Sequence, residues 1–146
     1  MSLAEWNAVL AVNLKSPFWA IAHVLPGLVE RGRGSILVTG SLASERGMAG
    51  NVGYVASKHA VLGLARAVAL EAAPHGVRCN CIVPGFIETP ILGTIPDKVI
   101  QEMEHRVPLK RLGQPEEIAN VYAFLASDEA SYINGAVIEV SGGMSV

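Results

Sequence analysis

The stretch Ser35-Ile36-Leu37-Val38-Thr39 is short, apolar and β-branched, and it decides the fold class. Its apolar residues follow one another without alternation, which is typical of a strand buried on both faces, as in a parallel sheet. We expect this first strand at 35–40, a second buried strand at 77–83 and a third strand at 136–140. The sequence therefore predicts three parallel strands.

A long helical segment precedes the first strand. Ser2-Leu3-Ala4-Glu5 can form a capping box that opens it, and Gly32-Arg33-Gly34 is expected to end it. Pro17 and Pro26 lie inside the segment. Because proline has no backbone N–H, each is expected to break or kink the helix.

Two more helices are predicted, from 54 to 73 and from 115 to 127. Strands that alternate with helices in this order predict an α/β domain with helices on both faces of the sheet. Residues 86–114 carry three prolines and form a long segment of the kind that serves as a lid or binding loop, with a short helix near 97–105. We interpret residues 1–146 as a single domain.

Composition excludes several classes of protein. The chain has 146 residues, a formal net charge of −2, 51% hydrophobic residues and 16% charged residues. Disorder requires the opposite balance, and a near-neutral chain has no field to attract nucleic acid. No uninterrupted apolar stretch predicts a membrane span, and the first residues do not resemble a signal peptide. Two cysteines are too few for a disulfide scaffold, so we expect a cytoplasmic protein.

Tyr54-Val55-Ala56-Ser57-Lys58 is the strongest local signal for chemistry. A tyrosine and a lysine four residues apart lie on one face of a helix, and an ammonium beside a phenol favours the phenolate. Such a tyrosine can act as a general acid toward a carbonyl oxygen. Taken alone, the pair is also explained by a core tyrosine and a lysine that runs along an ordinary amphipathic helix.

Other polar or glycine features are expected at the same edge of the sheet. Ser41 follows the first predicted strand, and Pro84-Gly85 ends the second. Ligands of parallel α/β sheets bind outside the carboxyl ends of the strands. A serine hydrolase is disfavoured, because Gly40-Ser41-Leu42-Ala43-Ser44 lacks the second glycine of a nucleophile elbow. Cys79 and Cys81 are interpreted as buried packing residues.

Together these motifs give a specific resemblance. From residue 2 to 143 the chain resembles the carboxyl-terminal part of a short-chain dehydrogenase/reductase, in the branch of 3-oxoacyl-acyl-carrier-protein reductases and hydroxysteroid dehydrogenases. The resemblance implies the carboxyl-terminal portion of a Rossmann-like, doubly wound parallel sheet. It depends on Asn13, Ser41, Tyr54-x-x-x-Lys58, the stretches 84–89 and 111–119, and the closing Ser141-Gly142-Gly143.

The resemblance implies catalytic roles for four residues. Tyr54 is expected to protonate the substrate carbonyl oxygen, or to deprotonate the alcohol in the reverse direction. Lys58 is expected to stabilise the phenolate and to hold the ribose hydroxyls of the cofactor. Ser41 is expected to orient the carbonyl oxygen, and Asn13 to keep its helix open around a water that relays protons to Lys58.

The implied cofactor is NAD or NADP, and the implied substrate is a ketone or a secondary alcohol, such as a 3-oxoacyl or steroid-like compound. The backbone of Ile87 and the side chain of Thr89 are expected to hold the nicotinamide carboxamide. We expect no metal, no nucleic acid or membrane partner, and a homo-oligomer, either a dimer or a tetramer. The full set of expected cofactor-binding residues is Tyr54, Lys58, Pro84, Gly85, Ile87 and Thr89.

One family motif, the glycine-rich phosphate turn between a strand and a helix, does not occur in the 146 residues. Met1 is expected well past the midpoint of a full-length member, and the chain is expected to be a truncated gene model, an internal start or a fragment. Residues 1–146 alone are therefore expected to aggregate, to be partly unfolded, or to assemble through 35–39 and the long helices, and to bind NAD(P) weakly or not at all. The alternative function is a non-catalytic fragment that acts only by oligomerising with a full-length relative.

Overall fold

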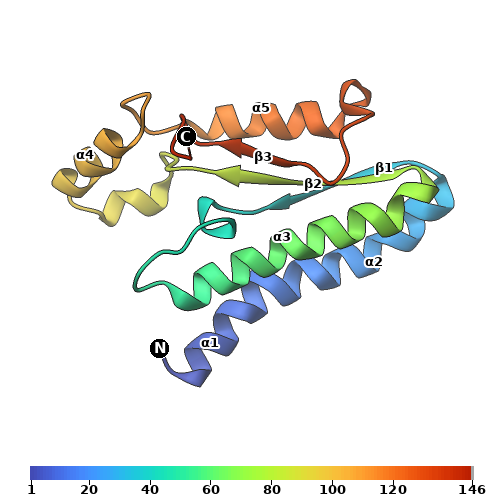
Figure 1. The fold of residues 1–146 in the computed structure, drawn as a ribbon, viewed down its shortest axis with the longest axis horizontal. Coiled ribbons are helices and arrows are strands. Elements are labelled where there is room, and N and C mark those ends of the chain that lie inside the picture. The colour runs from blue at the N-terminus through green and yellow to red at the C-terminus, as the bar shows by residue number, and fades with distance from the viewer. Residues whose placement is uncertain (146) are drawn as a thin grey trace.

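The computed structural model describes residues 1–145, which form a sheet of three parallel strands (Figure 1). The strands are β1 (Gly34–Thr39), β2 (Val77–Pro84) and β3 (Val137–Val140). Their order is β1-β2-β3, with Ile36 opposite Cys79 and Ile82 opposite Ile138. The predicted number and direction of the strands are confirmed, and each predicted strand differs from the observed one by a single residue at one or both ends.

Helices cover both faces of the sheet, as predicted (Figure 1). On one face, a rod of α1 (Leu3–Leu10), a π-helical turn η1 (Ala11–Lys15) and α2 (Ser16–Arg31) lies beside α3 (Val52–Ala72). On the other face lies α5 (Pro115–Ala126). The lid segment holds α4 (Asp97–Arg106) and the short turn η4 (Pro90–Thr94), while the remaining short turns are η2 (Leu42–Ser44), η3 (Ala73–His75) and η5 (Asp128–Ala130).

The first helix begins as predicted, but the predicted effect of its two prolines holds only in part. The Glu5 N–H donates to Ser2 Oγ at 3.2 Å and the Ser2 N–H donates to Glu5 Oε2 at 2.6 Å, which confirms the capping box. Pro17 follows the π-helical turn, where the helix widens without ending. At Pro26 the sequence predicts a break or a kink; the helix does not break, since α2 continues through Pro26, and a kink there stays a prediction. The carbonyl that Pro26 leaves without a donor belongs to Ala22, an exposed residue, so water can hydrate it.

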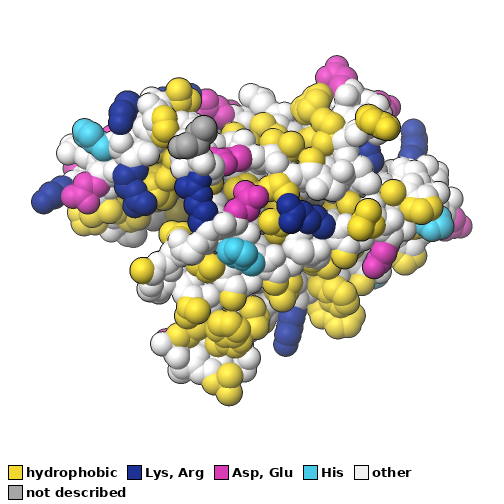
Figure 2. All heavy atoms as spheres, in the orientation of Figure 1, with side chains coloured by type: hydrophobic (Ala, Val, Ile, Leu, Met, Phe, Trp, Pro, Cys, Tyr) yellow, Lys and Arg dark blue, Asp and Glu magenta, His cyan; other side chains and the backbone are white. Residues whose placement is uncertain are grey.

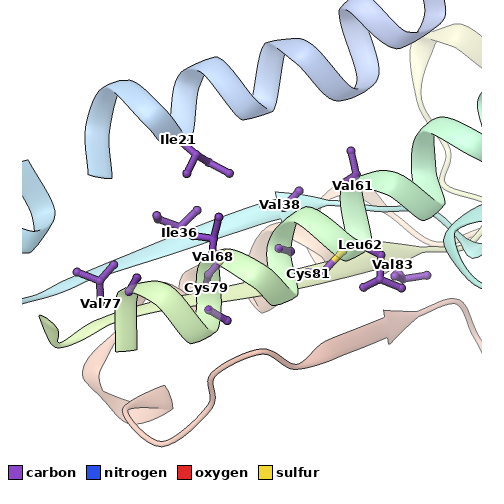
Figure 3. Close-up of a cluster of buried hydrophobic side chains, with 13 residues drawn as sticks. Ile21, Ile36, Val38, Val61, Leu62, Val68, Val77, Cys79, Cys81 and Val83 are labelled. Carbon is purple, nitrogen blue, oxygen red and sulfur yellow. The ribbon is translucent and has the colours of Figure 1, made fainter. Parts of the chain in front are cut away.

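The larger hydrophobic core lies between the sheet and the α2–α3 layer (Figure 3). The face of α3 predicted to be buried is buried, through Val61, Ala65, Val68 and Ala72. Cys79 and Cys81 are free thiols in this core, as expected for packing residues. Burial raises the pKa of the Cys79 thiol to about 12. A second core under α5 surrounds Ile82 and Leu125.

The first helical rod leaves much of its surface uncovered. Hydrophobic side chains gather over α1 and along α2 (Figure 2), and Phe18 and Trp19 are respectively 47% and 67% exposed. The stretch Leu3–Arg31 reaches a mean hydropathy of 1.4, so by length and composition it could cross a membrane. The absence of a membrane partner therefore stays a prediction.

Candidate active site

The predicted site residues gather where the strands end. The carboxyl ends of all three strands point the same way, toward the left in Figure 1. Ser41 follows β1, Pro84 is the last residue of β2, and Ser141 follows β3. The first turns of α3 lie at this same end of the molecule (Figure 1). The structure thus brings the expected catalytic and cofactor-binding segments to one edge of the sheet.

Tyr54 and Lys58 form the centre of this arrangement. They stand one turn apart near the start of α3, both half-buried, and Lys58 Nζ lies 5.8 Å from the centroid of the Tyr54 ring. The ammonium donates a hydrogen bond to the carbonyl of Thr39 at 2.9 Å. Burial lowers the pKa of Lys58, because desolvation disfavours the charged amine. A cation is thereby fixed beside a phenol at a position that solvent reaches only in part.

Asn13 lies in the π-helical turn η1, which widens the first helix opposite α3. Its Nδ2 donates to Ser57 Oγ at 3.1 Å, and the Ser57 hydroxyl donates to the Tyr54 carbonyl at 2.7 Å. Asn13 and Lys58 also line one groove, of about 570 Å³, along the edge of β1 that faces away from β2. The structure thus brings Asn13 close to the Tyr54–Lys58 turn. A water relay through Asn13 stays a prediction.

Ser57 is a site residue that the sequence analysis did not single out. It is fully buried and joins η1 to the turn of α3 that carries Tyr54. Its sequence signal is weak: a small polar residue within an otherwise apolar helix face. A serine at this place allows close approach of the two helices and supplies the hydroxyl that couples them.

Ser41 lies in the tight turn that leads out of β1. Its Oγ accepts from the Ala43 N–H at 3.2 Å, and its own N–H donates to Ser44 Oγ at 3.1 Å. A Cβ at Gly40 would lie 2.9 Å from Cys81 Sγ and 3.1 Å from Val83, so only glycine fits there. The turn packs against α3, but within residues 1–145 no hydrogen bond joins Ser41 to Tyr54.

The expected cofactor-binding residues continue from the end of β2. The Gly85 N–H donates to the Val140 carbonyl at 3.0 Å, and a Cβ on Gly85 would lie 2.7 Å from Ser141 Cα. Ile87 and Gly113 form an isolated parallel bridge. Its two hydrogen bonds use the carbonyl of the residue before Ile87 and the N–H of the residue after it. The N–H and C=O of Ile87 itself, and the Thr89 hydroxyl, bond to nothing within the described residues. These groups are free to bind a ligand.

The lid is tied at its carboxyl end by surface interactions. Arg111 makes two hydrogen bonds of 2.7 Å to the Glu117 carboxylate, and Gln114 Nε2 donates to Glu88 at 2.8 Å. The Arg111 guanidinium lowers the pKa of Glu117 to about 2. A cleft of about 640 Å³ lies between parts of the lid itself and the start of α5, and Ser41, Tyr54 and Lys58 do not line it. Its charged lining residues are carboxylates only, namely Glu88, Asp97, Glu104 and Glu116.

Comparisons with known proteins agree with this geometry. A family model described as enoyl-(acyl carrier protein) reductase matches residues 1–145. Human (3R)-3-hydroxyacyl-CoA dehydrogenase is 43% identical over 145 residues, which are 99% of this chain and 56% of that protein. For the 3-oxoacyl-acyl-carrier-protein reductase of Thermotoga maritima the identity is 41% over 146 residues, or 100% of this chain and 59% of that protein. The chain belongs to the short-chain dehydrogenase/reductase family.

A solved structure extends this comparison to the fold. A protein assigned as an NAD(P)-dependent gluconate 5-dehydrogenase from Beutenbergia cavernae, with NADP bound at low occupancy, matches 99% of this chain and 59% of its own at a TM-score of 0.94 and 37% identity. The Rossmann-like fold class is confirmed. The chain spans 56% to 59% of the relatives named above. The expected start beyond the midpoint of a relative is wrong, because a chain that covers more than half of a protein cannot begin there.

Proposed function

We propose that the protein is an oxidoreductase that transfers a hydride between NAD or NADP and a ketone or a secondary alcohol. The observation that carries the proposal is the half-buried Tyr54–Lys58 pair, with the ammonium 5.8 Å from the ring centroid at the carboxyl edge of the parallel sheet. A phenol beside a fixed cation in this position suits proton transfer to a carbonyl oxygen. The family relationship supports the same chemistry.

The protein residues supply the proton and the orientation. Tyr54 Oη donates a proton to the carbonyl oxygen during reduction and takes it back during oxidation. The Lys58 ammonium stabilises the phenolate that remains. Ser41 Oγ donates a second hydrogen bond that orients the carbonyl, while Asn13 holds the relay water expected beside Lys58.

The residues at the end of β2 fit a nicotinamide cofactor. The free N–H and C=O of Ile87 match the amide of a carboxamide, and the free Thr89 hydroxyl lies two residues further on. The absence of a side chain at Gly85 lets the backbone pass close to Ser141 and keeps Pro84 at the end of the strand. When bound, the nicotinamide supplies or accepts the hydride. Ile87 and Thr89 would fix which of its faces meets the substrate.

The proposed acid indicates the class of the reacting group. Proton transfer from Tyr54 suits an uncharged carbonyl oxygen, with the Lys58 ammonium beside the phenol. We therefore propose a neutral ketone or alcohol, with 3-oxoacyl and steroid-like compounds as candidates. Human (3R)-3-hydroxyacyl-CoA dehydrogenase and the Thermotoga reductase, by their names, act on acyl compounds.

We also propose a homo-oligomer, either a dimer or a tetramer, in the cytoplasm. The uncovered apolar residues of the first helical rod support assembly, since Val12 is 70% exposed and Trp19 is 67% exposed. Two cysteines that remain free thiols support a reducing compartment. The mass of the protein in solution tests the assembly.

The deciding experiment compares two tyrosine variants of the intact natural protein. Oxidation of NADH and NADPH is followed with a 3-oxoacyl thioester and with a cyclic ketone. Tyr54→Phe keeps the packing but removes the acid, so turnover should fall by about 10²–10⁴-fold. Tyr132→Phe is the control, because Tyr132 is fully exposed and distant in sequence. Equal turnover in both variants would refute the proposal, and an inactive wild type that assembles with a relative would favour the non-catalytic alternative.

A further inference from the structure

A hydrogen bond connects α5 to the end of β1. Tyr122 Oη and Thr39 Oγ1 are hydrogen-bonded although the residues are 83 positions apart. Along β1 the side chains alternate: Ile36 and Val38 face the α3 core, and Leu37 packs in the α5 core. Thr39 follows that alternation and meets Tyr122 on the α5 face. Burial raises the pKa of Tyr122, so its hydroxyl stays protonated and can keep this bond.

The same threonine binds the proposed catalytic lysine on the opposite face of the sheet. The Thr39 carbonyl accepts the hydrogen bond from Lys58 Nζ at 2.9 Å. Thr39 is therefore held by its side chain from α5 and by its carbonyl from α3. It is the last residue of an edge strand within the described chain, where a peptide group has a neighbouring strand on one side only.

We propose that Thr39 and Tyr122 are a positioning pair that fixes the Lys58 ammonium beside Tyr54. The inference rests on the proposed function. A lysine side chain has several rotatable bonds, so an ammonium stays in one place only if a fixed acceptor holds it. The Thr39 carbonyl is such an acceptor, and the Tyr122 hydroxyl limits its movement by holding the Thr39 side chain.

The other groups around Lys58 do not replace this acceptor. The Tyr54 ring lies 5.8 Å away and offers its face, which attracts the cation weakly. Cys81 is the titratable group that acts on Lys58 from β2, and burial raises the pKa of that thiol, so it is uncharged at neutral pH. Within the described residues, the Thr39 carbonyl is therefore the hydrogen-bond acceptor that holds the ammonium.

The test measures Lys58 directly in the intact natural protein. Acetic anhydride acylates only the neutral amine, so the acylation rate of each lysine against pH gives its state of protonation, with Lys15, Lys98 and Lys110 as internal references. Tyr122→Phe and Thr39→Val each remove the bond between the two side chains. The Thr39 carbonyl is then free to move, and the Lys58 ammonium loses stabilisation. We expect the Lys58 midpoint to fall by about half a pH unit, which is roughly a threefold faster acylation below the midpoint.

Two further variants serve as controls. Thr39→Ser keeps the hydroxyl and should restore the wild-type rate for Lys58. Ser35→Ala removes another bond between β1 and α5, the one from Ser35 Oγ to the Leu125 carbonyl at 2.9 Å, at the far end of the strand. It should leave Lys58 unchanged. The double variant Thr39→Val/Tyr122→Phe should change Lys58 no more than either single variant, because both remove one bond.

Turnover gives the second readout. Tyr122→Phe should lower kcat about threefold with little change in KM, and the pH profile of kcat should shift in the same direction as the Lys58 midpoint. Unchanged acylation of Lys58 in both Tyr122→Phe and Thr39→Val would refute the proposal that this pair positions Lys58. An equal change at all four lysines would refute it as well. Because acylation needs no turnover, a shifted Lys58 in a protein without reductase activity would refute the proposed function and retain the pair.

Discussion

Tyr54 and Lys58 stand on a helix whose inner face is packed into the main core, whereas Ile87 and Thr89 stand on a segment held by hydrogen bonds at the surface. Under Lys58 the helix buries Val61 and Ala65, which are 1% and 2% exposed. In the lid, Val107 and Leu112 near its carboxyl end are buried, whereas none of residues 86–106 is. The Arg111–Glu117 ion pair is a further tie at the surface, with both side chains more than 40% exposed.

Because of this difference, we expect the part of the site on α3 to be rigid and the part on the lid to be mobile. Burial of apolar side chains is worth roughly 1.5–3 kcal/mol for each residue, so the Tyr54–Lys58 turn cannot move without disrupting the core. Segments with few buried apolar contacts open at low free energy, and none of residues 86–106 is buried. The acid is thus fixed, and we expect residues 86–106 to open while Val107 and Leu112 stay packed. Mobility of the lid stays a prediction.

The largest expected effect is on the rigid side. In Lys58→Ala the phenolate loses its cation, so kcat should fall by about 10²–10⁴-fold while the fold persists. Steady-state kinetics and circular dichroism measure the two quantities. Lys98→Ala, on the exposed surface of α4, is the control and should keep wild-type turnover. Loss of activity in both variants to the same extent would contradict the assignment.

The next effect concerns stability. Ile82 is fully buried between the two helical layers, so Ile82→Ala should lower the free energy of unfolding by about 2–5 kcal/mol. The lid residue Val99 is 41% exposed, so Val99→Ala should change the free energy of unfolding by less than about 0.5 kcal/mol. Urea denaturation measures both. Similar losses in the two variants would show that the lid belongs to the same cooperative core as the sheet.

A smaller effect is expected at the junction of the two regions. In Gly85→Ala the new Cβ would lie 2.7 Å from Ser141 Cα, so the backbone before Ile87 must shift. Overpacking costs roughly 1–3 kcal/mol, and we expect affinity for NADH or NADPH to fall about tenfold, measured by fluorescence titration. Gly93→Ala is the matched control, because nothing lies within 4 Å of its Cβ. Equal affinity for the cofactor in both variants would show that Gly85 has no role in cofactor binding.

The smallest expected effect concerns the pH dependence of the Arg111–Glu117 ion pair in the lid. The pKa of Glu117 is lowered from its ordinary 4.5 to about 2, so the stabilisation it gives is present above pH 4.5 and lost as the pH falls toward 2. Carboxyl NMR shifts should show the low value in the wild type. In Arg111→Met the pKa should rise, but stay below 4.5, because the Gln114 N–H still binds the carboxylate. An unchanged titration would mean that the ion pair does not form in solution.

The sequence predicted the features that depend on neighbouring residues. The three parallel strands, the capping box of Ser2 and Glu5, and the buried face of α3 are confirmed because each follows from local pattern and spacing. Burial on both faces holds for β2 only: β1 buries one face and β3 is half-buried. At Pro17 the sequence predicted an interruption but not its form, since the π-helical turn depends on contacts with α3. At Pro26 the helix continues, and the carbonyl left without a donor belongs to the exposed Ala22, where water can reach it.

Contacts between distant residues could not be predicted from one sequence. Asn13 meets Ser57, and Thr39 meets Tyr122, through tertiary packing that leaves no periodic pattern in the chain. The bridge between Ile87 and Gly113 likewise depends on where the lid returns. The expected edge position of β1 is confirmed within the described residues, and the catalytic and cofactor roles stay predictions.

The thiol of Cys79 has a practical consequence for anyone who studies this protein. Its side chain is fully enclosed and its pKa is about 12, so in the native state it is neither accessible nor nucleophilic at neutral pH. A thiol reagent can react with it only after β2 has separated from α3. The labelling rate of Cys79 therefore measures how often the core opens, and the measurement needs neither an engineered cysteine nor a denaturant.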